Sequence, residues 1–181
     1  MSTPASILSL HDAAKPLLDF YQRGGVAPPE LLPIDGADMP EPFRKLLVHA
    51  DDMTPTLEHF HGARIHLRMV NREVTEAAYT REVILEAGEG NQPVEFGAIA
   101  IHLEQFPEAA RELILGESVP LGTILADHTI LHQSCPQAYF RVNSDPLITE
   151  ALGLPDSTEL YGRCNIHRNL NGNHLAEIVE I

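Results

Sequence analysis

Arg81 is the residue whose position in the sequence most clearly offers binding chemistry. It lies in the strand-like stretch TREVIL, with the apolar residues Val83 and Leu85 on its own face. Such an arginine either faces solvent with its stem over apolar surface, or directs its guanidinium at a carboxylate inside a pocket. A charged hydrogen bond of the second kind contributes about 1.5–3 kcal/mol. The pattern alone leaves both interpretations open.

Glu177 is the second candidate, in the stretch HLAEIVEI near the end of the chain. A glutamate buried between Ala176 and Ile178 would have a raised pKa and would serve as an acid or a base. A glutamate on an outer sheet face is the commoner case. Glu180 follows on the opposite face of the same predicted strand, and we expect it to be an ordinary surface residue.

Residues 50–60, ADDMTPTLEHF, form a helix start that also bears on binding. Thr54 is predicted to cap a helix with Pro55 at its first position, and Gly62 is predicted to end it. The free N–H groups of a helix start can bind a carboxylate. The turn VPLG, residues 119–122, offers further backbone donors, although a Pro-Leu-Gly turn is also an ordinary loop.

Two groups of histidines suggest a rival, metal-based chemistry. If residues 127–132 are helical, His128 and His132 share a helix face. The spacings match no closed zinc signature, and surface or capping histidines are the commoner case, so no metal site is predicted. The members of the two groups are His59, His61 and His66, and Asp127, His128, His132 and Cys135.

Composition limits the partners that the chain can have. The 181 residues include 44% hydrophobic and 21% charged residues, with a formal net charge of −14. This acidity argues against nucleic acid and against an anionic membrane surface. Cys135 and Cys164 make no disulfide framework, and the first residues lack a signal-peptide pattern, so we expect a cytoplasmic protein with reduced thiols. There is no glycine-rich phosphate loop and no Gly-x-Ser-x-Gly motif.

The elements that must position these residues follow from periodicity and from turn residues. Helix-like segments come first and strand-like segments follow, with short helices between them. Helices are predicted at residues 5–23, 41–50, 55–61, 106–115 and 145–152, and strands at 63–70, 79–87, 93–103 and 137–143, with a hairpin over 158–181 around Asn171-Gly172; residues 26–42 read as an extended, proline-rich segment, and 119–126 are ambiguous.

Strands joined by tight turns predict an antiparallel sheet in an α+β domain, with the helices collected on one face. We find no internal repeat, low-complexity tract or linker, so residues 1–181 are taken as a single domain.

The order of these motifs resembles that of the chorismate pyruvate-lyase family, which makes 4-hydroxybenzoate from chorismate. The similarity covers about residues 43–181 and leaves residues 1–42 as a variable N-terminal helix and proline-rich wrap. No single motif in it is specific. The motifs are, in order, DDMT (51–54), TREVIL (80–85), VPLG (119–122), YGR (161–163) and NGNHLAEIVE (171–180).

The resemblance implies a six-stranded antiparallel sheet with helices on one face and an enclosed site for an aromatic acid. Arg81 would take the ring carboxylate and Glu177 would meet the hydroxyl at the far end of the ring. DDMT would form a wall of the pocket. The other residues that the resemblance places at the substrate are Met53, Thr54, Leu121, Gly122 and Arg163.

The implied function is a cofactor-free lyase acting on chorismate or a close cyclohexadiene relative. Chorismate would lose its enolpyruvyl ether and a ring proton, and aromatisation would drive the reaction. No metal or organic cofactor is required, and we expect a monomer or homodimer. The stretch DHTILHQSCPQ departs from the family pattern, as does the end at Ile181, and Arg163 and Arg168 are separated by other residues.

Two alternatives remain. The same fold resembles the effector-binding domains of some bacterial transcription regulators, which suggests a non-catalytic binder of an aromatic acid. The first 60 residues show no basic helix-turn-helix, so a stand-alone binder is the form of this alternative that we keep. The other is a metal enzyme that uses the histidine groups.

Overall fold

One antiparallel sheet organises the protein, as the computed structural model shows for residues 8–76, 78–155 and 157–181. The strand order is β1-β5-β6-β7-β4-β3-β2. Hairpins join β2 to β3, β3 to β4 and β6 to β7. Strands β5 and β6 pair through a longer connection that contains a helix, and β4 pairs with β7 across the chain. The strands are β1 (Leu32–Ile34), β2 (Ile65–Val74), β3 (Tyr79–Ala87), β4 (Gln92–Ile101), β5 (His132–Asn143), β6 (Glu159–Asn169) and β7 (His174–Glu180).

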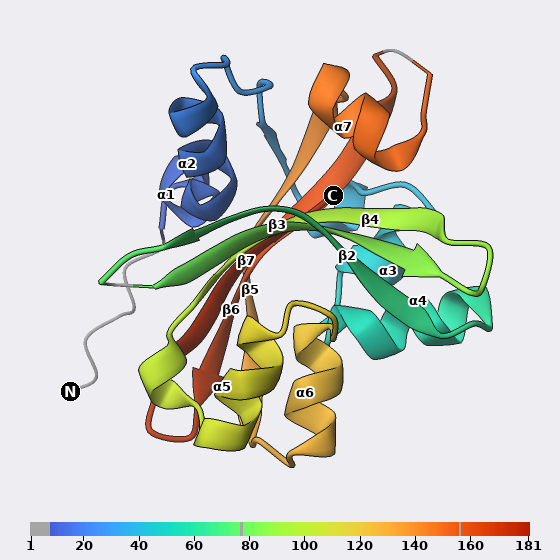
Figure 1. Ribbon diagram of the computed structural model, residues 1–181. Coiled ribbons are helices and arrows are strands. Elements are labelled where there is room, and N and C mark those ends of the chain that lie inside the picture. The colour runs from blue at the N-terminus through green and yellow to red at the C-terminus, as the bar shows by residue number, and fades with distance from the viewer. Residues whose placement is uncertain (1–7, 77, 156) are drawn as a thin grey trace.

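Helices cover both faces of this sheet (Figure 1). The first face carries α1 (Leu10–Ala13), α2 (Lys15–Gly24) and α7 (Pro146–Leu152), and the second carries α3 (Phe43–Leu47), α4 (Met53–His61), α5 (Glu108–Leu115) and α6 (Leu121–Asp127). Two short 3-10 helices, Gly36–Asp38 and Leu103–Gln105, complete the described elements. No helix in the described ranges is long and apolar enough to cross a membrane.

The predicted α+β class with an antiparallel sheet is confirmed, with two differences in detail. The sheet has seven strands, because the proline-rich segment contributes the three-residue strand β1 beside β5. The helices are not confined to one face, because α1, α2 and α7 pack on the face opposite to α3, α4, α5 and α6. Strand β3, which lies next to the edge strand β2, is consequently buried along its whole length.

Local chemistry accounts for the N-terminal helices. The predicted helix 5–23 is two helices that meet at Ala14, just ahead of Pro16. Proline is accepted in the first turn of a helix but not in its interior, so α2 restarts there. Ser9 caps α1 through its hydroxyl, and Gly25 ends α2 with a positive φ. Residues 5–7 of the predicted helix, and the chain start used to argue against a signal peptide, lie outside the described residues.

Three hydrophobic clusters fill the space around the sheet. One lies under α1, α2 and α7, and includes Phe96 and Phe140. The other two lie on the second face, one including Ile99 and Ile124 under α5 and α6, and one including Leu57 under α3 and α4. The second face is therefore apolar at both ends, and its polar residues gather between the two clusters.

Candidate functional site

A cavity of about 60 Å³ lies between the two hydrophobic clusters of the second face. By the space that one buried water needs, about 15 Å³, this is room for roughly four water molecules. Its walls are the first residues of α4 and α6 and parts of strands β2, β3, β4, β6 and β7. The lining residues are Asp52, Met53, Thr54, Leu67, Arg81, Val83, Leu85, Glu95, Gly97, Ala98, Ile99, Pro120, Leu121, Gly122, His167, Ile178 and Glu180.

Five of the sequence-predicted site residues come together at this cavity. Three segments far apart in the sequence supply them: the start of α4, strand β3 and the start of α6. The five are Met53, Thr54, Arg81, Leu121 and Gly122. Their role in binding stays a prediction.

Glu177 is not among them, and this placement needs correction. Glu177 is paired with Ala100 and Ile166, so its side chain projects from the other face of the sheet. There it contacts His102 at 2.9 Å, as well as His174. Glu180 lies three residues further, on the cavity face, so the structure reverses the two expected positions.

Arg81 lies in the cavity wall with 1% of its surface exposed. Its Nη1 donates a long hydrogen bond of 3.4 Å to the carbonyl oxygen of Ile114, and its Nε has no hydrogen-bond partner among the described residues. Burial lowers the pKa of this guanidinium, although Tyr79 and Glu117 counteract part of that effect. Arg81 is thus a buried cation with unused donors beside a cavity.

Arg163, the other predicted arginine, lies behind the cavity wall. It forms a buried salt bridge with Glu180, which does line the cavity. Its Nη atoms also donate to the carbonyl oxygens of His49 at 3.1 Å and Asp51 at 3.2 Å. Burial lowers its pKa, but Glu180 outweighs that effect, so the pKa of the Arg163 guanidinium is raised. Arg163 therefore ties the loop before α4 to the sheet.

Glu95 adds a second carboxyl group to the cavity wall, next to Glu180. It is 7% exposed, and its Oε2 has no hydrogen-bond partner in the described part of the chain. Burial and the Glu180 charge raise the pKa of Glu95 well above its ordinary value, against the pull of Arg163. This shift favours the protonated form of Glu95 over the charged form. A protonated carboxyl group is a hydrogen-bond donor inside the cavity.

The starts of α4 and α6 meet over the cavity. A Cβ atom on Gly122 would lie 2.8 Å from Oγ1 of Thr54, so glycine allows the two helix ends to approach this closely. The predicted cap differs from the structure: α4 begins at Met53 with Asp52 in the N-cap position, and Thr54 is buried in the first turn. Asp52 makes no capping hydrogen bond, because its carboxylate turns toward two histidines.

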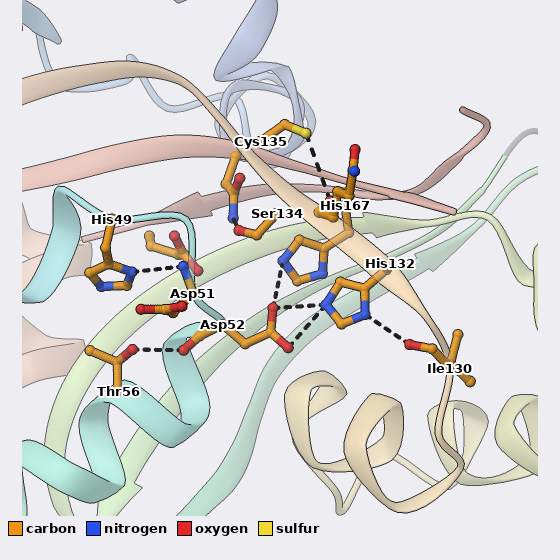
Figure 2. Close-up of polar contacts among 12 residues, drawn as sticks. His49, Asp51, Asp52, Thr56, Ile130, His132, Ser134, Cys135 and His167 are labelled. Carbon is orange, nitrogen blue, oxygen red and sulfur yellow. Dashed lines mark hydrogen bonds and ion pairs between the residues drawn. The ribbon is translucent and has the colours of Figure 1, made fainter. Parts of the chain in front are cut away.

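Those two histidines are His132 and His167, and both direct a ring nitrogen at Asp52 (Figure 2). His132 Nε2 lies 2.9 Å from Oδ1 of Asp52, and His167 Nε2 lies 3.5 Å from the same oxygen. Burial raises the pKa of Asp52, but His132 and the other nearby positive charges lower it below its ordinary value. Burial lowers the pKa of His167 to about 4, so its ring is neutral.

The predicted histidine groups do not form in the expected way. Residue 127 ends α6 and His132 begins β5, so His128 and His132 share no helix face. His59 and His61 lie exposed near the end of α4, and His66 is exposed on β2. In the described ranges, two clusters of potential metal ligands occur instead: Asp52, His132 and His167, and His102, His174 and Glu177.

Sequence reasoning missed His167, Glu95 and Glu180 as residues of the cavity wall. Alternation along β6 carries the signal for His167, because Arg163, Asn165 and His167 occupy every second position and share a face. Each of these polar residues is buried, with at most 4% exposed. Three consecutive buried polar positions on one strand face indicate a polar site rather than a core.

Comparisons with known proteins agree on the fold. No protein-family model matches the sequence, and no curated protein matches it significantly. PhnF from Mycobacterium smegmatis matches with a TM-score of 0.56 and 10% identity, over 74% of this chain and 64% of that one, so this chain spans less than two thirds of that protein. The effector domain of PhnF matches with a TM-score of 0.55 and 10% identity, over 71% of this chain and 86% of that domain.

Identities this low establish the fold alone, and no shared family follows from them. The fold supplies three features to the site. They are the strand order, the helices on the second face and the cavity between two apolar clusters. The chain has the α+β fold that effector domains of this type share with chorismate lyases.

Proposed function

We propose that the protein binds a small organic acid in the cavity, with the ligand's carboxylate paired to Arg81. The observation that carries this proposal is the state of Arg81: 1% exposed, with one long hydrogen bond and an unpartnered Nε. Tyr79 and Glu117 offset only part of the cost of burying Arg81, which forms no direct salt bridge with a described residue. An entering carboxylate would remove much of the remaining cost. The similarity to an effector domain supports a binding role.

The cavity wall favours an acid with an apolar body. Val83, Leu85, Ile99 and Ile178 supply apolar surface around the guanidinium. We therefore expect an aromatic or cyclohexadiene carboxylic acid rather than a sugar acid. Because the cavity measures only about 60 Å³, a ring enters when the first turns of α4 and α6 move apart at the Thr54–Gly122 contact.

Calorimetric titration with 4-hydroxybenzoate, benzoate and the uncharged 4-hydroxybenzyl alcohol tests this proposal. The acids should bind and the alcohol should not. Arg81→Gln should weaken acid binding by about 10- to 150-fold, the equivalent of a charged hydrogen bond of about 1.5–3 kcal/mol. Arg111→Gln is the matched control, since Arg111 is exposed on α5 and remote from the cavity lining.

Two results would count against acid binding at Arg81. One is equal affinity of the wild type and Arg81→Gln for the same acid. The other is that no member of the aromatic and cyclohexadiene series raises the melting temperature of the wild type.

Lyase activity is the second candidate, and one observation favours it. Arg81 and Glu95 line the same cavity, and burial and Glu180 raise the pKa of the Glu95 carboxyl group. A cation for the substrate and a candidate proton donor would then lie in one site. In this second candidate function, Glu95 and Glu180, which line the cavity, would replace Glu177 at the substrate. If the protein is a lyase, pyruvate and 4-hydroxybenzoate appear together from chorismate, well above its spontaneous decay, and Glu95→Gln slows both. If the protein binds the acids but does not turn over chorismate, the lyase role is rejected and the binding role is kept.

A further inference from the structure

Asp52, His132 and His167 converge from three elements onto one point at the edge of the cavity. They come from the N-cap of α4, the first residue of β5 and the buried face of β6 (Figure 2). Their ligand atoms all lie within 4.8 Å of one another. We propose that these three side chains bind a divalent transition-metal ion of the zinc class at the cavity wall.

The hydrogen bonds of His132 require either a second proton or a metal cation at its Nε2. Its Nδ1 lies 2.9 Å from the carbonyl oxygen of Ile130, which can only accept, so Nδ1 carries a proton. Its Nε2 lies 2.9 and 3.0 Å from the two carboxylate oxygens of Asp52, which also only accept. A neutral imidazole has one N–H, so Nε2 must carry a second proton or face another cation. A carbonyl oxygen on the far ring nitrogen is the usual way to orient a metal-binding histidine.

His167 supplies an independent reason. It is 4% exposed, and neither ring nitrogen makes a hydrogen bond to any described residue. A buried polar group without a partner is costly, and native proteins keep few of them. Its Nε2 points at Asp52 from 3.5 Å, so an ion between the two would give this nitrogen its missing partner.

Asp52 occupies a position where an aspartate normally stabilises its own helix. An N-cap aspartate usually accepts a hydrogen bond from a backbone N–H of the first turn, and this contact stabilises the helix. Asp52 makes no such bond, and its carboxylate faces His132 and His167 instead. The Asp52 side chain therefore contacts the two histidines instead of capping its own helix.

The donor set and the spacing suit zinc. Two imidazole nitrogens and one carboxylate oxygen form a recurrent three-ligand zinc set that leaves a fourth position open. Zinc bound at about 2.0–2.2 Å separates neighbouring ligand atoms by about 3.4 Å in a tetrahedron. The distances to Asp52 Oδ1, 2.9 Å from His132 and 3.5 Å from His167, bracket that value. Asp52 and His167 line the cavity, so the ion would border the space that the organic acid is proposed to enter.

Zinc titration of untagged protein, freed of metal by chelator and dialysis, tests the site. Competition with a chromophoric chelator gives the affinity and stoichiometry, and the visible spectrum of the Co²⁺ form reports coordination by nitrogen and oxygen. We expect one tightly bound ion per chain, and at least a tenfold loss of affinity in both Asp52→Asn and His167→Ala. Circular dichroism verifies that each variant is folded. If His167→Ala does not fold, Asp52→Asn alone decides the test.

Two control variants separate this site from other metal-binding residues. Asp51→Asn removes the neighbouring acid, whose side chain is exposed, and should leave the affinity unchanged. His174→Ala breaks the second cluster and should also leave the tight site intact. The proposal is overturned if the wild type binds no zinc, if Asp52→Asn binds as well as the wild type, or if His174→Ala alone abolishes binding.

This proposal stands apart from acid binding, and the two can fail separately. Zinc is titrated with no organic acid present. The acid titrations are repeated with a chelator in the buffer, where Arg81 alone supplies the positive charge.

Discussion

Arg81 and Arg163 are two buried arginines on the same sheet face with opposite surroundings. Arg163 forms a salt bridge with Glu180 and donates to several backbone carbonyl groups of the loop before α4. Arg81 has one long hydrogen bond, to Ile114, and an Nε without a partner. Both are at most 1% exposed, so burial does not distinguish them.

The difference teaches how to separate a structural from a functional charge. A buried ion whose donors are all used holds the fold together, and its removal leaves its partners unpaired. A buried ion whose donors are unused lowers the stability of the fold. It is retained where a ligand supplies the missing hydrogen-bond partners. Counting hydrogen bonds on each charged group is therefore more informative here than burial or the size of the side chain.

The largest expected effect comes from replacing the two arginines in turn. Arg163→Met leaves Glu180 as a buried charge without its partner and should lower the free energy of unfolding by about 3–5 kcal/mol. Arg81→Met removes a poorly paired cation and should leave that free energy unchanged or higher. Urea unfolding followed by circular dichroism measures both.

A double variant checks the cause of the Arg163 effect. Arg163→Met combined with Glu180→Leu removes both charges and should recover much of the lost stability. Equal losses for Arg81→Met and Arg163→Met would contradict the distinction between the two arginines.

The pH dependence of stability sharpens the comparison at Glu95. Its pKa is raised well above 4.5, so the native protein holds a proton that the unfolded chain has released. Stability therefore falls as the pH rises above about 4.5, by about 1.4 kcal/mol for each pH unit over which native Glu95 alone stays protonated. Glu95→Gln should remove this decline, so its advantage over the wild type should grow as the pH rises above about 4.5.

An exposed glutamate provides the control for that measurement. Glu104→Gln, on a side chain that is 64% exposed, should give the wild-type profile. A constant difference between Glu95→Gln and the wild type at all pH values would show that Glu95 is ionised in the native protein.

The smallest expected effect is that of Glu177→Gln. The Glu177 side chain is 25% exposed on the face opposite the cavity, so we expect a change in stability within about 0.5 kcal/mol and no change in acid binding. Thermal melts with and without 4-hydroxybenzoate measure both. If Glu177→Gln lost acid binding and Glu180→Gln kept it, Glu177 would be the residue at the ligand, as the sequence predicted.

The alternation of side chains along the strands and the order of the motifs along the chain made part of the site predictable. Arg81 was found because Val83 and Leu85 share its face, and the α4 and α6 segments because their motifs follow in a known order. Glu177 was misplaced because its flanking residues are apolar on both sides, so the local pattern does not say which face meets the cavity. That choice depends on the pairing of β7 with β4, which joins segments about 80 residues apart in the sequence.

Long-range contacts also explain what was missed in the fold. Strand β1 has only three residues, one of which is Pro33, and it exists because β5 offers a free edge. His167 and Asp52 meet only when β6 and the start of α4 are brought together, and no sequence spacing encodes that approach. Local propensity predicted most elements, whereas tertiary pairing decides which side chains face each other.

The bonds from Arg163 to the loop before α4 have a consequence for recognition. The carbonyl groups of Leu47, His49 and Asp51 are tied to one guanidinium in the middle of the sheet, and Asp52 follows directly. The chain at this edge of the cavity has thus lost its freedom during folding, before any guest arrives. A molecule that binds there loses little affinity to ordering this segment, because the segment is already ordered in the free protein. The contacts that stabilise the sheet therefore also favour binding.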